Sequence, residues 1–342
     1  MRIVFICGCL EPGKDGVGDY TRRLAAGLID DNIEVAILAL NDQFITEVIC
    51  QDQTSDKIKI CTYRIPSRYN TNQRYAYAKK WINSITPDWL SLQYVPFSFN
   101  KKGLSINLGR NLSKLTVNTR WHIMFHELWV GMKKGSTLKH IVWGELQKHL
   151  IIKLINKLKP TLIHTQTKLY QIQLSKLGFQ VEYLPLFSNV PVNHSLNKLP
   201  TFEEKIKLVN FGTIHPTITI KDFAEEAAIY EKKTGVKIEL TLIGRCGVEQ
   251  EKWIKIWKSV GLNIFILGEQ SLEKISEIFN ASTFGISTTA PPLVEKSGSV
   301  AAMLEHDLPV ICISNVWHPR GISGVPKMPG IIEYKFGNFD TG

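Results

Sequence analysis

Short apolar runs alternate with helix-like segments along the 342 residues of the chain. Residues 3–6 and 310–313 are apolar at every position, which is typical of strands buried on both faces of a parallel sheet. Helical segments between such strands indicate parallel sheets covered by helices on both faces. We therefore expect an α/β fold made of doubly wound, Rossmann-like units. Strands are expected at 2–8, 33–40, 57–64, 88–93, 120–126, 161–165, 181–185, 206–212, 237–243, 263–267, 283–287 and 309–313. Helices are expected at 19–30, 74–85, 140–158, 168–177, 221–234, 250–260, 271–280 and 298–306.

One stretch without strand or helix periodicity divides this pattern in two. Residues 187–195 are rich in turn formers, and a new apolar strand begins at Ile206. We expect an N-terminal Rossmann-like domain over 1–190, a linker over 191–205 and a C-terminal Rossmann-like domain over 206–342. The length suits two domains that each bury a core of their own.

The composition is that of a globular protein. Hydrophobic residues make up 44% of the chain and charged residues 21%. No apolar run reaches the roughly 18 residues of a transmembrane helix, and the N-terminus reads as a buried strand and not as a signal peptide. The six cysteines are scattered without paired CxxC spacing, which favours reduced structural thiols and argues against a zinc site. These features together predict a cytoplasmic location.

The net charge of +10 favours an anionic partner such as a nucleotide phosphate or a membrane surface. Much of the charge lies between residues 133 and 159, where lysines alternate with apolar residues. Two interpretations remain open for this segment. It is either a basic amphipathic helix in peripheral contact with a membrane or an ordinary helix with a solvated lysine face. We expect no nucleic-acid partner.

A glycine-containing turn follows the first predicted strand. It carries Gly13, Gly16 and Gly18 and leads into a helix. Glycines allow the backbone to approach a phosphate, and a helix start offers amide donors. The turn matches neither a Walker loop nor GxGxxG, so a dinucleotide site is not indicated. The alternative is a plain tight turn without a ligand.

Two further turns of this kind follow strands in the second half. One contains Gly212 and Thr213. The other runs through Lys296, Ser297 and Gly298 into a helix that a serine would cap. Lys296 adds a full charge beside the amides of the first helical turn, so a diphosphate would fit there. A capped helix without a ligand is the alternative.

Taken together, the segments around these turns resemble retaining glycosyltransferases of family 4, which have the GT-B fold of two Rossmann-like domains facing a cleft. The matches occur in order and span nearly the whole chain, and they are specific for the superfamily and not for a substrate. The matching segments are GVGDYTRRL at 16–24, MFHELW at 124–129, FSNVP at 187–191, VNFGT at 209–213, LIGR at 242–245, EKSGS at 295–299 and LPVI at 308–311.

The resemblance implies transfer of a sugar from a nucleotide-sugar donor to a hydroxyl of a glycan, a lipid-linked acceptor or a small molecule. The nucleotide sugar is then a substrate, and no cofactor is expected. The resemblance implies a retaining reaction, and we expect no metal because no DxD-like acidic pair is found. By resemblance, His126 and Glu295 would act at the donor sugar, whereas Asp19 and Glu127 would shape the acceptor site. The implied donor-binding residues are Gly16, Gly18, Gly212, Thr213, Arg245, Lys296, Ser297, Gly298 and Ser299.

The chain departs from the family pattern at several places. The position of the second glutamate, which holds the ribose, reads Ala302, and Glu305 lies about 4.5 Å further along a helix. The places of an arginine and a lysine that hold the diphosphate read Thr213 and Ile218. The helices that usually end this fold are not evident after Ile332. A sugar-nucleotide epimerase of GT-B fold and a non-catalytic GT-B regulator therefore remain alternatives. His126 likewise has the alternative of a structural histidine.

Overall fold

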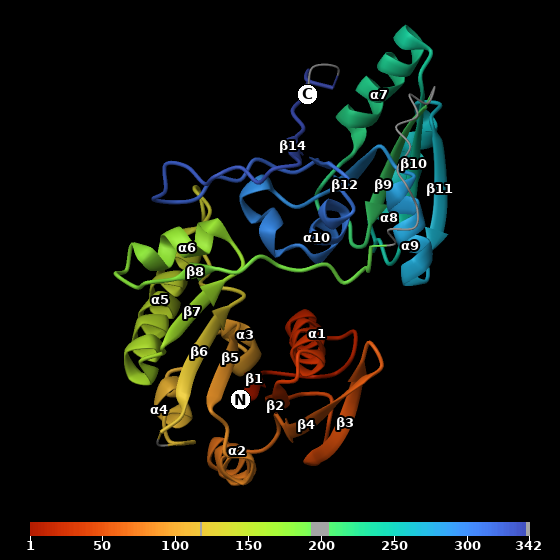
Figure 1. Ribbon diagram of the computed structural model, residues 1–342. Helices are drawn as coiled ribbons and strands as arrows, with labels where there is room; N and C mark the ends of the chain where they lie inside the picture. Colours follow the sequence, from red (N-terminus) through yellow and green to blue (C-terminus); the bar gives the residue numbers. More distant parts are fainter. Residues whose placement is uncertain (117, 193–204, 340–342) are drawn as a thin grey trace. The chain divides into compact units, whose positions relative to one another are not determined.

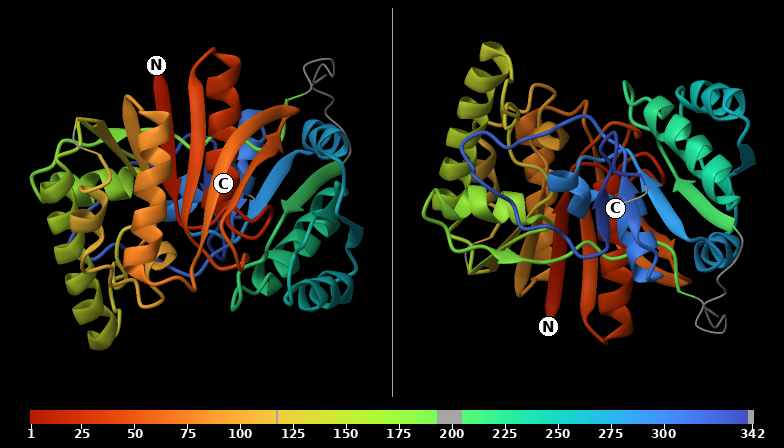
Figure 2. Two further views of the ribbon diagram at one scale, coloured as in Figure 1. Left: turned by 90° about the horizontal axis from the view of Figure 1, so that it is seen from below. Right: turned by 90° about the horizontal axis from the view of Figure 1, so that it is seen from above.

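The computed structural model of the chain forms two compact units, Met1–Leu184 and Pro185–Gly342, each built around its own sheet (Figure 1). Figure 2 shows that helices cover the sheet of each unit. The linker predicted at 191–205 lies mostly outside the described residues. No described helix has the length and apolar character needed to cross a membrane. The structure describes residues 1–116, 118–192 and 205–339.

The first unit alternates strands and helices as the apolar pattern predicts. Its strands are β1 (Arg2–Cys7), β2 (Glu34–Asp42), β3 (Ile49–Ser55), β4 (Ile58–Pro66), β5 (Trp89–Tyr94), β6 (Arg120–Phe125), β7 (Leu162–Thr165) and β8 (Glu182–Tyr183). Its helices are α1 (Gly16–Asp30), α2 (Thr71–Ile85), α3 (Pro96–Phe99), α4 (Leu108–Leu112), α5 (Leu138–Leu158) and α6 (Lys168–Ser175).

The strand order of this sheet is β3-β4-β2-β1-β5-β6-β7-β8. The chain moves from β1 outward to β2 and later returns to place β5 on the other side of β1. The topological switch point therefore lies between β1 and β5. In open α/β sheets, ligands bind outside the carboxyl ends of the strands at such a point.

One edge of the sheet differs from the expected parallel arrangement. The strand β3 was not predicted, and it pairs with β4 in antiparallel fashion. Asp56 and Lys57 join the two strands, and both have a positive φ, 49° and 68°. Positive φ at both residues is what a two-residue type I′ turn requires. The usual signal for such a turn is Asn-Gly or Asp-Gly, so Asp-Lys beside a polar strand gave no warning of a hairpin.

The second unit has six strands among its described residues, in the order β11-β10-β9-β12-β13-β14 with parallel pairing throughout. Its switch point lies between β9 and β12. The strands are β9 (Lys205–Phe211), β10 (Lys237–Ile243), β11 (Asn263–Gly268), β12 (Phe284–Ser287), β13 (Val310–Cys312) and β14 (Ile331–Glu333). The helices are α7 (Lys221–Thr234), α8 (Gln250–Ser259), α9 (Leu272–Asn280), the 3-10 helix η1 (Pro291–Lys296) and α10 (Gly298–Glu305).

Two apolar layers stabilise this second sheet, one on each face. Trp253 and Trp257 of α8 are fully buried on the face that α7 also covers. Phe279 of α9 and Met303 of α10 are fully buried on the other face. Neighbouring strand residues such as Leu208 and Val209 point to opposite faces. The central strands of this sheet are thus buried on both sides, whereas the edge strand β11 is largely exposed.

Candidate functional site

The start of α1 is already occupied by a carboxylate. Asp15 caps this helix, and its Oδ1 accepts hydrogen bonds of 2.9 Å from the backbone amides of Val17 and Gly18. Asp19 accepts from the backbone amide of Gly13 at 3.1 Å and pairs with Arg22. A diphosphate that used the Gly18 amide would therefore have to displace Asp15.

The two glycines of this turn that were predicted to bind the donor, Gly16 and Gly18, differ in their surroundings. A Cβ on Gly18 would lie 2.6 Å from the carbonyl oxygen of Cys9, so glycine allows α1 to pack against the loop after β1. A Cβ on Gly16 would meet no atom within 4 Å. Gly16 thus borders open space, whereas Gly18 is explained by packing.

A buried ion network holds the loop between β1 and this turn. Asp42 is fully buried, and its Oδ2 lies 2.7 Å from Nε of Arg64 and accepts from the backbone amide of Leu10 at 3.2 Å. Arg64 also lies 2.7 Å from Glu11. Burial would raise the pKa of Asp42, but hydrogen bonds from Arg64 and from the amides of Phe44 and Leu10 outweigh it and lower the pKa. None of these residues was predicted, although a charged residue ending a buried strand is a signal for such a network.

His126 follows β6 at the carboxyl edge of the first sheet. Its side chain is 5% exposed, and its Nε2 lies 2.9 Å from Oε1 of Gln93 on β5. The ring also packs edge-on against Tyr20 of α1, with 4.9 Å between centroids. Burial lowers the pKa of His126 to about 4, so the ring is neutral near pH 7. His126 and the start of α1, both predicted from the sequence, thus lie together. Glu127 is half-buried directly beside them.

In the second unit, the loops after three neighbouring strands are bonded to one another. Gly212 after β9 donates to the carbonyl of Ile243 at 2.9 Å, and Gly244 after β10 donates to the carbonyl of Gly268 at 2.7 Å. The three glycines Gly212, Gly244 and Gly268 have φ of 82°, 82° and 64°. Glycine adopts these angles without strain, so the loops turn sharply and lie side by side.

Thr213 and Arg245, predicted to contact the donor, lie on these loops. The Thr213 hydroxyl is 3.5 Å from the Arg245 carbonyl. The Arg245 guanidinium pairs with Glu269 at 2.9 Å, and both side chains are largely exposed. The structure therefore brings Gly212, Thr213 and Arg245 together at the carboxyl edge of the sheet, as the prediction of a shared site requires.

The start of α10 forms the second predicted surface. Ser297 caps the helix and accepts from the backbone amide of Val300 at 3.4 Å, and its hydroxyl lies 3.1 Å from that of Ser299. A Cβ on Gly298 would meet no atom within 4 Å. Lys296 and Glu295 are half-exposed immediately before the cap. Open space thus adjoins Gly298 at the positive end of the helix dipole, with Lys296 two residues earlier in the chain.

Both surfaces of the second unit flank its switch point. Gly212 and Thr213 follow β9, whereas the 295–299 segment follows β12, the strand next to it. The backbone amide of His215 donates to the hydroxyl of Thr288 at 2.9 Å, which joins the two loops. The sequence-predicted residues of this unit therefore gather where open α/β sheets bind ligands.

The departures from the family pattern have structural explanations. Ala302 is fully buried in the core and Ile218 is 6% exposed, so neither position faces solvent. Glu305 accepts a hydrogen bond of 2.8 Å from the backbone amide of Ser188, which explains this residue without a ligand. Among the described residues, no group of three or more histidine, cysteine or acidic side chains is arranged to hold a metal ion.

Solved structures with a similar fold exist. HepE of Anabaena, solved with UDP and glucose, is similar with a TM-score of 0.55 and 14% identity over 91% of this chain and 80% of that one. TarM is similar with a TM-score of 0.58 and 11% identity over 99% and 89%. The pneumococcal O-GlcNAc transferase GtfA, solved with UDP and GlcNAc, gives 0.51 and 9% over 91% and 83%. The chain has the GT-B fold.

This likeness concerns the fold alone, because the identities lie between 9% and 14%. No protein-family model and no curated protein sequence matches the chain. The predicted fold class, two Rossmann-like domains of GT-B type, is confirmed. The roles of the site residues stay predictions that rest on their placement at the carboxyl edges of the two sheets.

Proposed function

We propose that this chain is a glycosyltransferase that moves a sugar from a nucleotide-sugar donor to an acceptor hydroxyl. The observation that carries the proposal is the start of α10, where open space adjoins Gly298, Lys296 lies two residues earlier, and the switch point of the second sheet is next to this segment. Such a surface suits a diphosphate. The proposal is further supported by the GT-B fold, since HepE and GtfA were each solved with UDP and a sugar.

The proposed reaction breaks the bond between the anomeric carbon and the diphosphate oxygen and forms a bond to the acceptor oxygen. The acceptor hydroxyl gives its proton to the departing diphosphate, so the protein supplies no nucleophile. Negative charge grows on the leaving phosphate, where the α10 amides and Lys296 would stabilise it. We propose retention of the anomeric configuration and metal independence, with His126 and Glu295 beside the donor sugar.

A nucleotide screen tests this function. Thermal unfolding would be followed with UDP, ADP, GDP and dTDP and with their common sugar conjugates. A ligand at one hundred times its Kd stabilises a protein by about 2.7 kcal/mol, which is easily detected. We expect one base to stabilise the chain and its sugar conjugate to release the diphosphate when an acceptor is added. Failure of every nucleotide would favour a non-catalytic protein, and an epimer formed from UDP-GlcNAc without diphosphate release would favour an epimerase.

Replacing Lys296 by alanine should weaken binding of the nucleoside diphosphate by about 1–3 kcal/mol, because a charged hydrogen bond is lost. Calorimetry would measure the Kd. Lys255→Ala is the matched control, because Lys255 is an exposed lysine on α8 of the same unit. An unchanged Kd for Lys296→Ala would remove this residue from the site.

We also propose that α5 contacts an anionic membrane surface, which would suit a lipid-linked acceptor. Leu138, Val142 and Leu146 are 76%, 54% and 49% exposed at intervals of four residues, so they form one apolar stripe on the helix. Lys133 and Lys139 are exposed close by. Apolar residues flanked by lysines are typical of helices that lie in a membrane interface.

Val142→Glu should lower binding to vesicles that contain phosphatidylglycerol at least about fivefold, because a charge replaces an inserted apolar side chain. Co-sedimentation at two salt concentrations would measure it, and wild-type binding should fall as salt rises. Tyr77→Glu serves as the control, since Tyr77 is 41% exposed on α2. Vesicles that fail to bind the wild-type protein would refute the membrane contact.

A further inference from the structure

Beyond the proposed site, His126 belongs to a chain of buried polar side chains, and the buried Gln166 side chain also hydrogen-bonds its ring. Its Nε2 lies 2.9 Å from Oε1 of Gln93, and Nε2 of Gln93 donates to the hydroxyl of Ser91 at 2.8 Å. Ser91 is 2% exposed, and Gln93 is fully buried. Both residues lie on β5 two positions apart, so their side chains share one face of the sheet.

The chain of hydrogen bonds continues across β6 and β7 to the edge of the sheet. The Ser91 hydroxyl lies 2.8 Å from Nδ1 of His122, and Nε2 of His122 lies 3.0 Å from Nδ1 of His164. Nε2 of His164 lies 3.6 Å from a carboxylate oxygen of Glu182 on β8. The strand register explains this geometry, because Ser91 pairs with His122 and His164 pairs with Glu182.

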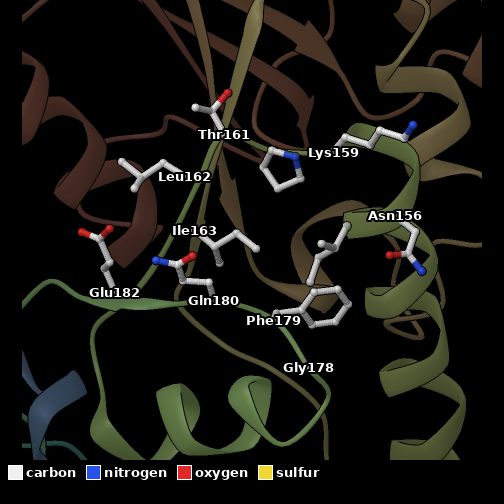
Figure 3. A pocket seen from close by; sticks show the side chains of 11 residues that line it. Asn156, Lys159, Thr161, Leu162, Ile163, Gly178, Phe179, Gln180 and Glu182 are labelled. Carbon is white, nitrogen blue, oxygen red and sulfur yellow. The ribbon is translucent and has the colours of Figure 1, made fainter.

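The outer end of the chain meets a cavity of about 570 Å³ beside α5 and β7, with Glu182 among its lining residues (Figure 3). The Glu182 side chain is 59% exposed and that of His164 is 16% exposed. Burial, together with the neighbouring histidines, lowers the pKa of His122 to about 3, and burial also lowers the pKa of His164 despite Glu182. The three histidines are therefore neutral near pH 7.

The hydrogen bonds between Glu182 and His126 can all point in one direction, so that each side chain donates to the next one toward Glu182. The Glu182 carboxylate only accepts, so its approach to within 3.6 Å of Nε2 of His164 favours a proton on that nitrogen, and Nδ1 of His164 then accepts. His122 then donates from Nε2 and accepts at Nδ1 from the Ser91 hydroxyl. With its own proton directed to His122, the Ser91 oxygen accepts from the Gln93 amide. Gln93 consequently presents its carbonyl oxygen to His126, which must donate from Nε2.

We propose that Ser91, His122, His164 and Glu182 are positioning residues that hold His126 in the Nε2-protonated form, with Gln93 as the link. Nδ1 of His126 is then a hydrogen-bond acceptor, which suits a donor such as the Gln166 amide or a hydroxyl of the donor sugar. This last step rests on the proposed function, whereas the protonation state of the ring does not. If these side chains only satisfied one another's hydrogen bonds, the tautomer of His126 would not depend on Ser91, which is separated from His126 by Gln93.

The tautomer can be measured directly in the wild-type protein. Long-range ¹H–¹⁵N spectra of protein labelled at histidine distinguish the Nε2-protonated from the Nδ1-protonated ring, and a His126→Phe variant assigns the signal. We expect the Nε2-protonated form of His126 in the absence of any nucleotide. A wild-type ring protonated at Nδ1 would overturn the proposal without the need for any further variant.

Ser91→Ala tests whether the outer residues of this hydrogen-bonded series affect the tautomer of His126. Without the hydroxyl, the Gln93 amide has no acceptor and can turn over, so about half of the His126 rings should shift to the Nδ1-protonated form. Ser91→Thr keeps the hydroxyl and should restore the wild-type spectrum. Thr62→Val is the control, because it removes another buried hydroxyl of the same sheet, one that bonds the Gln51 carbonyl instead. An unchanged tautomer in Ser91→Ala would refute the proposal.

These outcomes remain separate from those of the nucleotide screen, because the spectra need no ligand. If the screen finds a transferase, Ser91→Ala should lower kcat by about twofold, in proportion to the lost tautomer, with the Kd for the nucleotide unchanged. A shifted tautomer with full kcat would refute the role in transfer. A shifted tautomer in a protein that binds no nucleotide would support the positioning chain and refute the proposed function.

Discussion

His126→Ala is expected to lower kcat for sugar transfer by about 100- to 1,000-fold, the loss typical of one preorganised hydrogen-bonding group in an active site. The ring is buried, neutral and held by Gln93, so its hydrogen bonding to a sugar costs no reorganisation at the moment of reaction. Diphosphate release at saturating donor would measure kcat. The Kd of the nucleoside diphosphate should change little, because Lys296 and α10 lie in the other unit.

The control for this variant is His149→Ala, which removes an exposed histidine of α5 in the same unit. Circular dichroism and unfolding curves would show that His126→Ala still folds. If kcat stayed within about twofold of wild type, the residue would be a structural histidine, as is common for a buried polar side chain with satisfied bonds.

Asp42→Ala is expected to lower the free energy of unfolding by about 3–5 kcal/mol, because it leaves the Arg64 charge buried without its main partner. Urea unfolding would measure the loss. Asp52→Ala is the control, since Asp52 is exposed on β3 and should change stability by less than about 0.5 kcal/mol. A loss below about 1 kcal/mol for Asp42→Ala would contradict the role of the network.

A double variant distinguishes the cost of leaving Arg64 buried without a partner from the cost of losing the ion pair itself. Asp42→Leu with Arg64→Met removes both charges, and well-packed apolar residues often replace a buried pair without loss. We expect the double variant to be more stable than Asp42→Ala.

The ion pair of Asp42 and Arg64 also predicts a pH dependence of stability. The pKa of Asp42 is lower in the folded state than in the unfolded state. The carboxylate therefore stabilises the fold fully at a pH above the unfolded-state pKa, and this stabilisation is lost as the pH falls through the folded-state pKa.

The elements that sequence patterns predicted are those with strong local signals. The range 221–234 was predicted for α7 and is observed with the same bounds, and the strands around 3–6 and 310–313 were found because every one of those positions is apolar. The edge strands β3 and β14 were missed. In β3 a polar sequence replaces the apolar run, and β14 is only three residues long. An edge strand was predicted where it keeps an apolar run, as β11 does.

The candidate site likewise contains local features that were predicted and long-range features that were missed. Glycine turns and the serine-capped helix start are local features, so their positions could be predicted from sequence. The Asp42–Arg64–Glu11 network joins residues as far as 53 positions apart and depends on strand register. The chain from Ser91 to Glu182 likewise exists only after β5, β6, β7 and β8 are placed side by side. Asp15 was missed because capping of its own helix competes with the anion-binding interpretation.

The hydrogen bond between Glu305 and Ser188 has a mechanical consequence. It ties the last residue of α10 to the stretch that enters the second unit, where Val190 is fully buried against the same helix. The stretch that enters this unit is thus anchored to α10 by one polar and one apolar contact.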